Sequence, residues 1–249
     1  MATMGMLNDM ALLDEISNDL SNVDTPGYKS DRLAFRTYLN RIIYSLNPDP
    51  KLNRVIKIPL GVLEGAVVVD EVRTDMNMGR LERTGNPLDL AINGGGFFAV
   101  RFKGEIVYTR AGNFKVNEKG HVITPNGAEL LDVSGKPIEF LEGYSITEDR
   151  WIVDRDGNRI ARIAVYDFDH PERLVKLGYT YFKKNNDSGE PKPSDVGVKV
   201  GYIERSNVNV LREMVNMIKA LRHFEISQRV ITTSDELLGR LMNNVGTLR

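Results

Sequence analysis

The sequence predicts an α+β protein in which N- and C-terminal α-helices form a coiled-coil-like element around an inserted all-β central domain. Three observations predict this fold. An apolar residue recurs at every seventh position near the C-terminus, a shorter amphipathic segment opens the chain, and short apolar segments separated by turn residues fill the middle. We expect a helical assembly segment at 1–30, an extended or linker region at 31–75, a β-rich domain at 76–205 and a long assembly helix at 206–249.

The first helix is predicted from apolar residues that lie on one side of an amphipathic segment. They follow a 4-3-7 spacing with two flanking positions: Met6, Met10, Leu13, Leu20, Ile16 and Val23. Pro26 and Gly27 should end this helix, because Pro disfavours helix at the preceding residue and Gly permits a turn. The segment before Lys29 is acidic and lacks basic residues. We therefore expect it to lie along the partly basic C-terminal helix, with charges setting the register.

The region that follows is mixed, and the middle of the chain reads as β-structure. Residues 33–46 fit either a helix or a strand, 47–50 form a break, and 67–72 read as a strand. Between 76 and 202, turns separate short strands at intervals of roughly 8–12 residues. This spacing is typical of an all-β sandwich or a barrel-like domain.

The C-terminal helix is predicted from two apolar rows and from the absence of Gly and Pro between 202 and 238. The first row is Val210, Met217, Phe224, Ile231, Leu238 and Val245. The second row is Leu211, Met214, Ile218, Leu221, Leu241 and Met242. Ser206 or Asn207 is a suitable N-cap. A helix of about 40 residues would be about 60 Å long, which exceeds the needs of a compact domain, so we expect neighbouring chains to cover it.

Composition excludes several classes of function. The 249 residues carry a net charge of −1, which argues against a general nucleic-acid or anionic-membrane surface. The chain has no cysteine, so disulfides, thiolate catalysis and cysteine-based zinc sites are excluded. The acidic first segment does not fit a cleaved secretory signal, and no apolar run approaches the length of a membrane span.

Individual motifs predict no catalytic, cofactor or metal site. The glycines at 94–96 precede Phe97 and Phe98, so a strand bulge or crossing is a better interpretation than a phosphate loop. Residues 154–158 resemble the start of a calcium loop, but Arg159 stands where that loop needs Gly. A hairpin turn explains this segment better. The three histidines have no metal-ligand spacing.

Four segments resemble bacterial flagellar rod and hook proteins, in the order that this family has them. Residues 17–29 match the signature Ser-Asn-x-Leu-Ala-Asn-Val-x-Thr-Pro-Gly-Tyr-Lys, except that Asp19 and Ser21 replace the usual Asn and Ala. Residues 83–100 fit the pattern Thr-Gly-x-x-x-Asp-x-Ala-Ile-x-Gly-x-Gly-Phe-Phe, and 108–114 continue it. Residues 206–225 resemble the family's C-terminal segment, whereas 133–200 match only weakly.

The resemblance implies a structural, non-enzymatic subunit of the flagellar basal-body rod that assembles helically through its terminal helices and transmits torque from motor to hook. Its partners would be copies of itself, other rod proteins and the flagellar type III export apparatus, with no cofactor, nucleic acid or membrane insertion. It would lie in the periplasmic rod, exported without a cleaved signal peptide. Residues 222–225 favour the proximal rod member of the family. The alternatives are the distal rod member, a hook–basal-body paralogue, a secreted oligomeric binding module, or an enzyme with an unrecognised site.

The resemblance also assigns roles to individual residues. N-terminal assembly residues would be Leu13, Ile16, Asn18, Leu20, Asn22, Val23, Thr25, Pro26, Gly27 and Tyr28. C-terminal assembly residues would be Ser206, Asn207, Val208, Asn209, Val210, Met214, Met217, Ile218, Leu221, Phe224, Ile231, Leu238 and Val245. Residues that shape the β domain would be Gly85, Asp89, Gly94, Gly96, Phe97 and Phe98.

Overall fold

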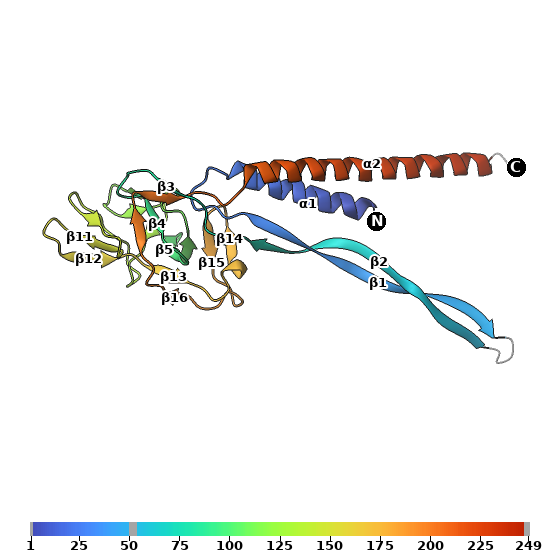
Figure 1. The fold of residues 1–249 in the computed structure, drawn as a ribbon, viewed down its shortest axis with the longest axis horizontal. Coiled ribbons are helices and arrows are strands. Elements are labelled where there is room, and N and C mark those ends of the chain that lie inside the picture. The colour runs from blue at the N-terminus through green and yellow to red at the C-terminus, as the bar shows by residue number, and fades with distance from the viewer. Residues whose placement is uncertain (1, 50–53, 247–249) are drawn as a thin grey trace. The chain divides into compact units, whose positions relative to one another are not determined.

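The structure of the protein is a computed structural model that describes residues 2–49 and 54–246 (Figure 1). Contacts divide the chain into two compact units. The helical unit consists of Met1–Ser17, Arg32–Val72 and Leu211–Arg249, and the β unit consists of Asn18–Asp31 and Arg73–Val210. Among the described residues, no helix is both long enough and apolar enough to cross a membrane.

The predicted fold class is wrong. The protein is mostly β, with one helix near each end, and no coiled coil between these helices is established in the described part of the chain. Helix α1 spans Ala2–Ser21 and helix α2 spans Val210–Gly246. An apolar repeat identifies a helix face but does not specify what covers that face. The exposed apolar residues of α1, such as Leu7 and Met10, and those of α2 show that the helices do not sheath each other.

The ambiguous region after α1 is β-structure. Strand β1 spans Asp31–Asp49, strand β2 spans Arg54–Thr74, and the two form a two-stranded sheet. Residues 33–46, for which the sequence allowed helix or strand, therefore lie in a strand. Residues 50–53 and the side chains of 37–68 lie outside the described part of the structure.

The largest sheet of the β unit has nine strands. Its main path runs β14-β15-β6-β5-β9-β8-β7, and β13 pairs with both β5 and β16. Its strands are β5 Phe97–Phe102, β6 Glu105–Thr109, β7 Lys115–Val116, β8 Val122–Ile123, β9 Glu129–Leu130, β13 Val165–Asp167, β14 Val175–Leu177, β15 Tyr181–Lys183 and β16 Lys192–Pro193. A 3-10 helix, Pro171–Arg173, precedes β14.

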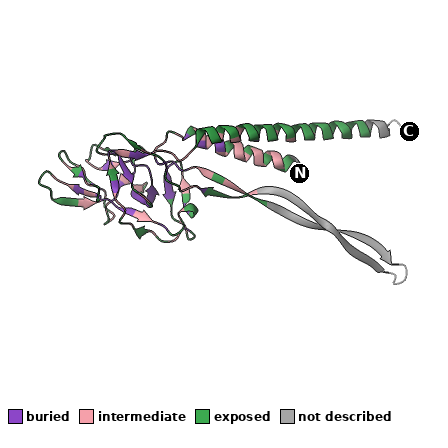
Figure 2. Ribbon diagram, in the orientation of Figure 1, coloured by how far each residue is buried: buried purple, intermediate pink, exposed green. Residues whose placement is uncertain are grey.

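Hydrophobic clusters lie on both faces of this sheet because side chains alternate along each strand. On β5, Phe98 and Val100 belong to one buried cluster, whereas Phe97 and Ala99 belong to the other. Figure 2 shows the buried residues concentrated in these strands. The central sheet is therefore an internal layer, which explains why β5 reads as a continuous apolar run.

Three smaller sheets complete the β unit. They consist of β3 Leu81–Arg83 with β18 Tyr202–Glu204, β4 Leu90–Ile92 with β17 Val198–Val200, and β10 Ser145–Ile146 with β11 Trp151–Val153 and β12 Arg159–Arg162. In the first sheet, Glu204 lies opposite Leu81. This pairing brings the chain segment that leads into α2 beside the segment that follows β2.

Candidate functional site: a buried junction of the sequence motifs

The three motif regions meet at Glu204, the last residue of β18. Lys29 Nζ lies 2.5 Å from Glu204 Oε1, and Arg110 Nη1 lies 3.4 Å from Glu204 Oε2. The Lys29 and Glu204 side chains are 0% and 1% exposed. We call Lys29, Arg110 and Glu204 the buried triad. It joins the end of the N-terminal motif, the middle motif and the entry to α2 within the β unit.

Backbone groups add hydrogen bonds to the triad, and Arg110 Nε is buried without a hydrogen-bond partner. Lys29 Nζ donates to the carbonyl oxygen of Asn77 at 2.7 Å, and the Gly79 N–H donates to Glu204 Oε1 at 2.9 Å. Arg110 Nη1 donates to the carbonyl oxygen of Gly94 at 2.8 Å. Buried charges are tolerated when paired and hydrogen-bonded, and removal of one partner leaves an uncompensated charge. The triad therefore holds five separate chain segments in one arrangement.

The triad contains two cations and one carboxylate. Burial lowers the pKa of Lys29, and the Glu204 charge opposes that shift. Burial likewise lowers the pKa of Arg110, whose guanidinium lies 5.1 Å from the centroid of the Phe97 ring. Glu204 is thus the shared counterion of both cations, and it is the member whose loss leaves two positive charges unbalanced.

A second polar network fixes the chain after α1. The Tyr28 hydroxyl donates to Asp19 Oδ1 at 2.8 Å, and both residues are buried. Lys176 Nζ lies 4.2 Å from the centroid of the Tyr28 ring, pairs with Asp31 Oδ2 at 2.8 Å and donates to the Lys29 carbonyl at 2.7 Å. Burial raises the pKa of Asp19, one of the two residues that depart from the family signature.

The turn after α1 needs glycine. Gly27 has φ +70°, and a Cβ there would lie 2.2 Å from the backbone nitrogen of Ala111. The Gly27 N–H donates to the Glu204 carbonyl at 2.8 Å. Before this turn, Asn22 Nδ2 donates to the Asn18 carbonyl at 2.9 Å, and Thr25 Oγ1 donates to Asn22 Oδ1 at 3.2 Å. Half-buried Pro26 follows, so the signature encodes a close backbone crossing.

The predicted N-cap is wrong. Helix α2 begins at Val210, three residues after Asn207, and the Ser206 and Asn207 side chains bond elsewhere. Asn207 Oδ1 accepts from the Ser30 N–H at 2.9 Å, and Asn207 Nδ2 donates to the Asp75 carbonyl at 2.7 Å. Ser206 Oγ accepts from the Val208 N–H at 3.2 Å. Asn207 thus holds the approach to α2 against the residues next to the ends of β1 and β2, whereas the Ser206 hydrogen bond is local.

The residues predicted to shape the β domain lie around the middle motif. Gly96 has φ +107°, and a Cβ there would lie 2.9 Å from Val165 Cγ1. Phe97 and Phe98 are buried on opposite faces of β5. Gly85 and Gly94 also have positive φ, and Asp89 is buried. The 94–96 glycines lead into a strand and not into a helix, so they do not form a phosphate loop.

The predicted assembly residues of the helices divide by burial. In α1, Ile16 is buried, whereas Leu13 and Leu20, like Val23 beyond the helix, are half-buried. In α2, half-buried residues follow one face: Met217, Phe224 and Ile231. Exposed residues are Asn209, Val210, Leu211, Met214, Ile218, Leu221, Leu238, Leu241 and Met242. The Val245 side chain lies outside the described residues.

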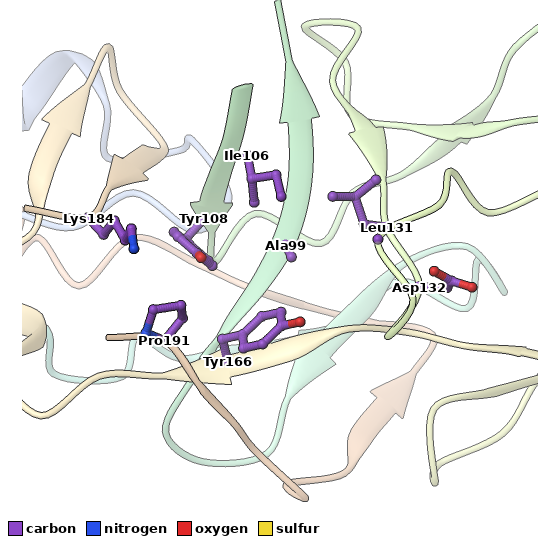
Figure 3. A pocket seen from close by; sticks show the side chains of 9 residues that line it. Ala99, Ile106, Tyr108, Leu131, Asp132, Tyr166, Lys184 and Pro191 are labelled. Carbon is purple, nitrogen blue, oxygen red and sulfur yellow. The ribbon is translucent and has the colours of Figure 1, made fainter. Parts of the chain in front are cut away.

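The hollow that Figure 3 shows measures about 300 Å³ and lies beside β5, β6 and β13. Tyr108 and Tyr166 both line it, with their rings edge to face and ring centroids 6.0 Å apart, and burial raises the Tyr108 pKa to about 12. Its charged groups have internal partners. Asp132 Oδ1 accepts two backbone N–H groups of its own turn, and Lys184 pairs with Glu190 at 2.6 Å. We assign no chemistry to this hollow.

The suspected calcium loop is a turn. Asp154 Oδ1 accepts the N–H groups of Asp156 and Asn158, each at 2.9 Å. Within residues 2–49 and 54–246, no group of three or more His, Cys, Asp or Glu side chains is placed to hold a metal ion.

Sequence reasoning missed the triad as a unit. Lys29 and Arg110 lie inside the quoted motifs, but Glu204 was not singled out, and it lies 175 positions from Lys29. Asn77 and Lys176 were missed as well. A charged residue in the apolar Tyr202–Glu204 strand is the only local signal, and it does not identify a partner.

The fold and the junction define a class of protein in which buried charges hold the chain segments next to both helices together within one β-rich unit. Comparisons with known proteins agree. Residues 199–244 match the flagellar basal body rod FlgEFG protein C-terminal model, and residues 91–175 match the flagellar hook protein FlgE/F/G D1 domain.

Similar proteins extend along nearly the whole chain. The flagellar basal-body rod protein FlgG of Bacillus subtilis is 31% identical over 96% of this chain and 95% of its own length. FlgG of Agrobacterium fabrum is 31% identical over 98% and 97%. The rod protein FlgF of Caulobacter vibrioides is 27% identical over 98% and 97%. The chain belongs to the flagellar basal-body rod protein family, and it is a structural subunit of the rod.

Proposed function

We propose that this subunit assembles with copies of itself and with other rod proteins through its terminal helices, and that the assembly transmits torque from motor to hook. The apolar face that α2 leaves exposed is the observation that carries this proposal. Leu211 is 77% exposed and Ile218 is 52% exposed, and Met214 and Leu221 lie beside them. Burying apolar surface contributes about 25 cal/mol per Å², so neighbours that cover this face stabilise an assembly.

Identical subunits that contact each other head to tail through unlike surfaces form an open helical polymer when their rotation does not close. This geometry suits a rod. Load must also pass along the chain within each subunit. The buried triad supports this part of the proposal, because it holds Lys29, in the segment that follows α1, and Glu204, in the segment that precedes α2, together within the β unit.

The proposal also covers enzymatic activity, cellular location and export. We propose that the subunit is not an enzyme, lies in the periplasmic part of the basal body and reaches it through the flagellar type III export apparatus without a cleaved signal. Family membership supports these statements.

Position along the rod is a finer question on which two observations differ. Residues 222–225 favour the proximal, FlgF-type member. Identities of 31% to FlgG relatives and 27% to an FlgF relative favour the distal, FlgG-type member. Tagged subunits visualised in isolated basal bodies will distinguish a position near the motor from one near the hook.

The exposed α2 face gives the direct test. Ile218→Asp places a charge on this face and should abolish swimming and incorporation into basal bodies, while the monomer keeps its unfolding free energy. Gln228→Asp introduces the same charge at another exposed position of α2 and is the matched control. Motility assays and immunoblots of purified basal bodies measure the outcome. Normal incorporation of Ile218→Asp would refute assembly through this face.

A further inference from the structure

Arg150 occupies a turn position that ordinarily selects glycine. The Arg150 N–H donates to the Thr147 carbonyl at 2.9 Å, and the Arg150 backbone has φ +69°. Residues other than glycine rarely adopt this left-handed backbone conformation. Among the described residues, Lys103 is the only other residue besides glycine with positive φ. Backbone conformations of this kind cluster at functional sites.

The Arg150 side chain is buried but incompletely paired. It is 2% exposed, and its Nη2 lies 3.4 Å from Asp195 Oδ1. Arg162 Nη2 lies 3.2 Å from the same oxygen. Charge-assisted hydrogen bonds between N–H and carboxylate are normally about 2.7–2.9 Å long. Two guanidiniums therefore share one carboxylate oxygen, and both contacts are longer than usual for this kind of hydrogen bond.

The two arginines have unused donors. The Nε atoms of Arg150 and Arg162 are both buried, and neither has a hydrogen-bond partner. The Arg150 Nη1 has only a 3.5 Å contact to the Ile163 carbonyl. Buried donors without partners are costly in folded proteins. Burial lowers the pKa of Arg150, and the charge of Arg162 adds to that shift, whereas the charges of Asp195 and Asp149 oppose it.

The position of the Asp195 carboxylate is open to solvent, because that side chain is 92% exposed. A carboxylate from another chain is not constrained by the 185–195 loop. It can give one oxygen to each guanidinium, so that each arginine donates a charge-assisted hydrogen bond to an oxygen of its own and none is shared.

We propose that Arg150 and Arg162 form a binding site for an acidic side chain of another protein chain, and that Asp195 is its internal substitute. The site lies on the β unit, so it is independent of the α2 face that carries the proposed function. Acetate, as the smallest carboxylate, is the probe for this chemistry.

The test uses the Nε–Hε resonances of arginine in the full-length, ¹⁵N-labelled protein. Acetate titrated at constant ionic strength against chloride should shift the Arg150 and Arg162 resonances saturably. Asp195→Asn removes the internal competitor, so saturation should occur at an acetate concentration about fivefold lower. Asp169→Asn, which removes an exposed carboxylate paired with Lys192, should saturate at the wild-type concentration.

A further variant removes one half of the site. Arg162→Gln should abolish the saturable response of Arg150. The proposal is overturned if acetate and chloride have equal effects, if Asp195→Asn and wild type saturate together, or if Arg150 responds unchanged without Arg162. A parallel titration with inorganic phosphate sets the ligand class. Tighter binding of phosphate than of acetate would contradict a carboxylate site.

Discussion

Glu204 is the residue on which the junction depends. It balances Lys29 and Arg110 in a buried space and also accepts the Gly79 N–H. None of its partners lies nearby in the sequence. The side chain therefore converts three distant segments into one rigid arrangement.

Glu204→Gln should destabilise the protein by about 3–5 kcal/mol, because two buried cations lose their counterion. Glu82→Gln is the matched control, since Glu82 pairs with Arg205 at the exposed surface, with Oε2 2.7 Å from Nε. Its loss should have a much smaller effect, because solvent screens exposed pairs. Urea unfolding measures both. Equal losses would show that the triad does not stabilise the fold.

Asp19 makes stability depend on pH in a predictable direction. Burial raises its pKa in the folded state, so the folded protein binds this proton more tightly than the unfolded chain does. The stability that the bound proton contributes is lost as pH rises from about 4 through the raised pKa. Tyr28 still donates a hydrogen bond to Asp19 in its ionised form.

Asp19→Asn should flatten this pH dependence, since Asn does not titrate but still accepts the Tyr28 hydroxyl. At pH 7 the variant should be at least as stable as the wild type. Thermal unfolding between pH 4 and pH 7 measures the difference. A variant whose stability declines with pH as steeply as the wild type would assign the dependence to another group.

At the scale of elements, α2 has two apolar faces with different roles. Met217, Phe224 and Ile231 are half-buried, whereas Leu211 and Ile218 are exposed. The seven-residue repeat that predicted the helix therefore selected mainly the face used within the chain. The row beside it is the face available to neighbours.

Alanine substitutions at one residue of each face should distinguish the two faces. Phe224→Ala should lower the unfolding free energy of the isolated protein. The loss should be smaller than the about 3–5 kcal/mol typical of a fully buried phenylalanine, because Phe224 is half-buried. Leu221→Ala, at an exposed position, should change it by about 0.5 kcal/mol or less. Denaturant unfolding of the two variants provides the comparison. A greater loss for Leu221→Ala would contradict the assignment of faces.

The sequence predicted both helices and the β-rich middle, because apolar periodicity and turn residues are local signals. It could not predict the β1–β2 sheet with the same clarity, since residues 33–46 fit a helix and a strand equally well. The α2 cap was misplaced because Asn207 bonds to Ser30 and Asp75, which only the fold brings near it.

At the scale of the whole molecule, family membership followed from motifs, whereas the buried triad required the structure. The signature residues Gly27 and Lys29 mark a backbone crossing and a buried ion pair, but their partners Ala111 and Glu204 are distant in sequence. The coiled-coil expectation failed for the same reason. An amphipathic pattern does not state whether its own chain or a neighbour covers it.

We propose that neighbouring subunits cover the exposed α2 face in the rod. The chain has no cysteine, so Ile218→Cys provides a unique thiol. Ile160→Cys, at an exposed position of β12, is the control. We expect maleimide to label the Ile218→Cys thiol in the monomer but not in isolated basal bodies, whereas assembly should affect labelling of the Ile160→Cys thiol less. Equal labelling of the Ile218→Cys thiol in monomer and rod would show that neighbouring subunits do not cover this face.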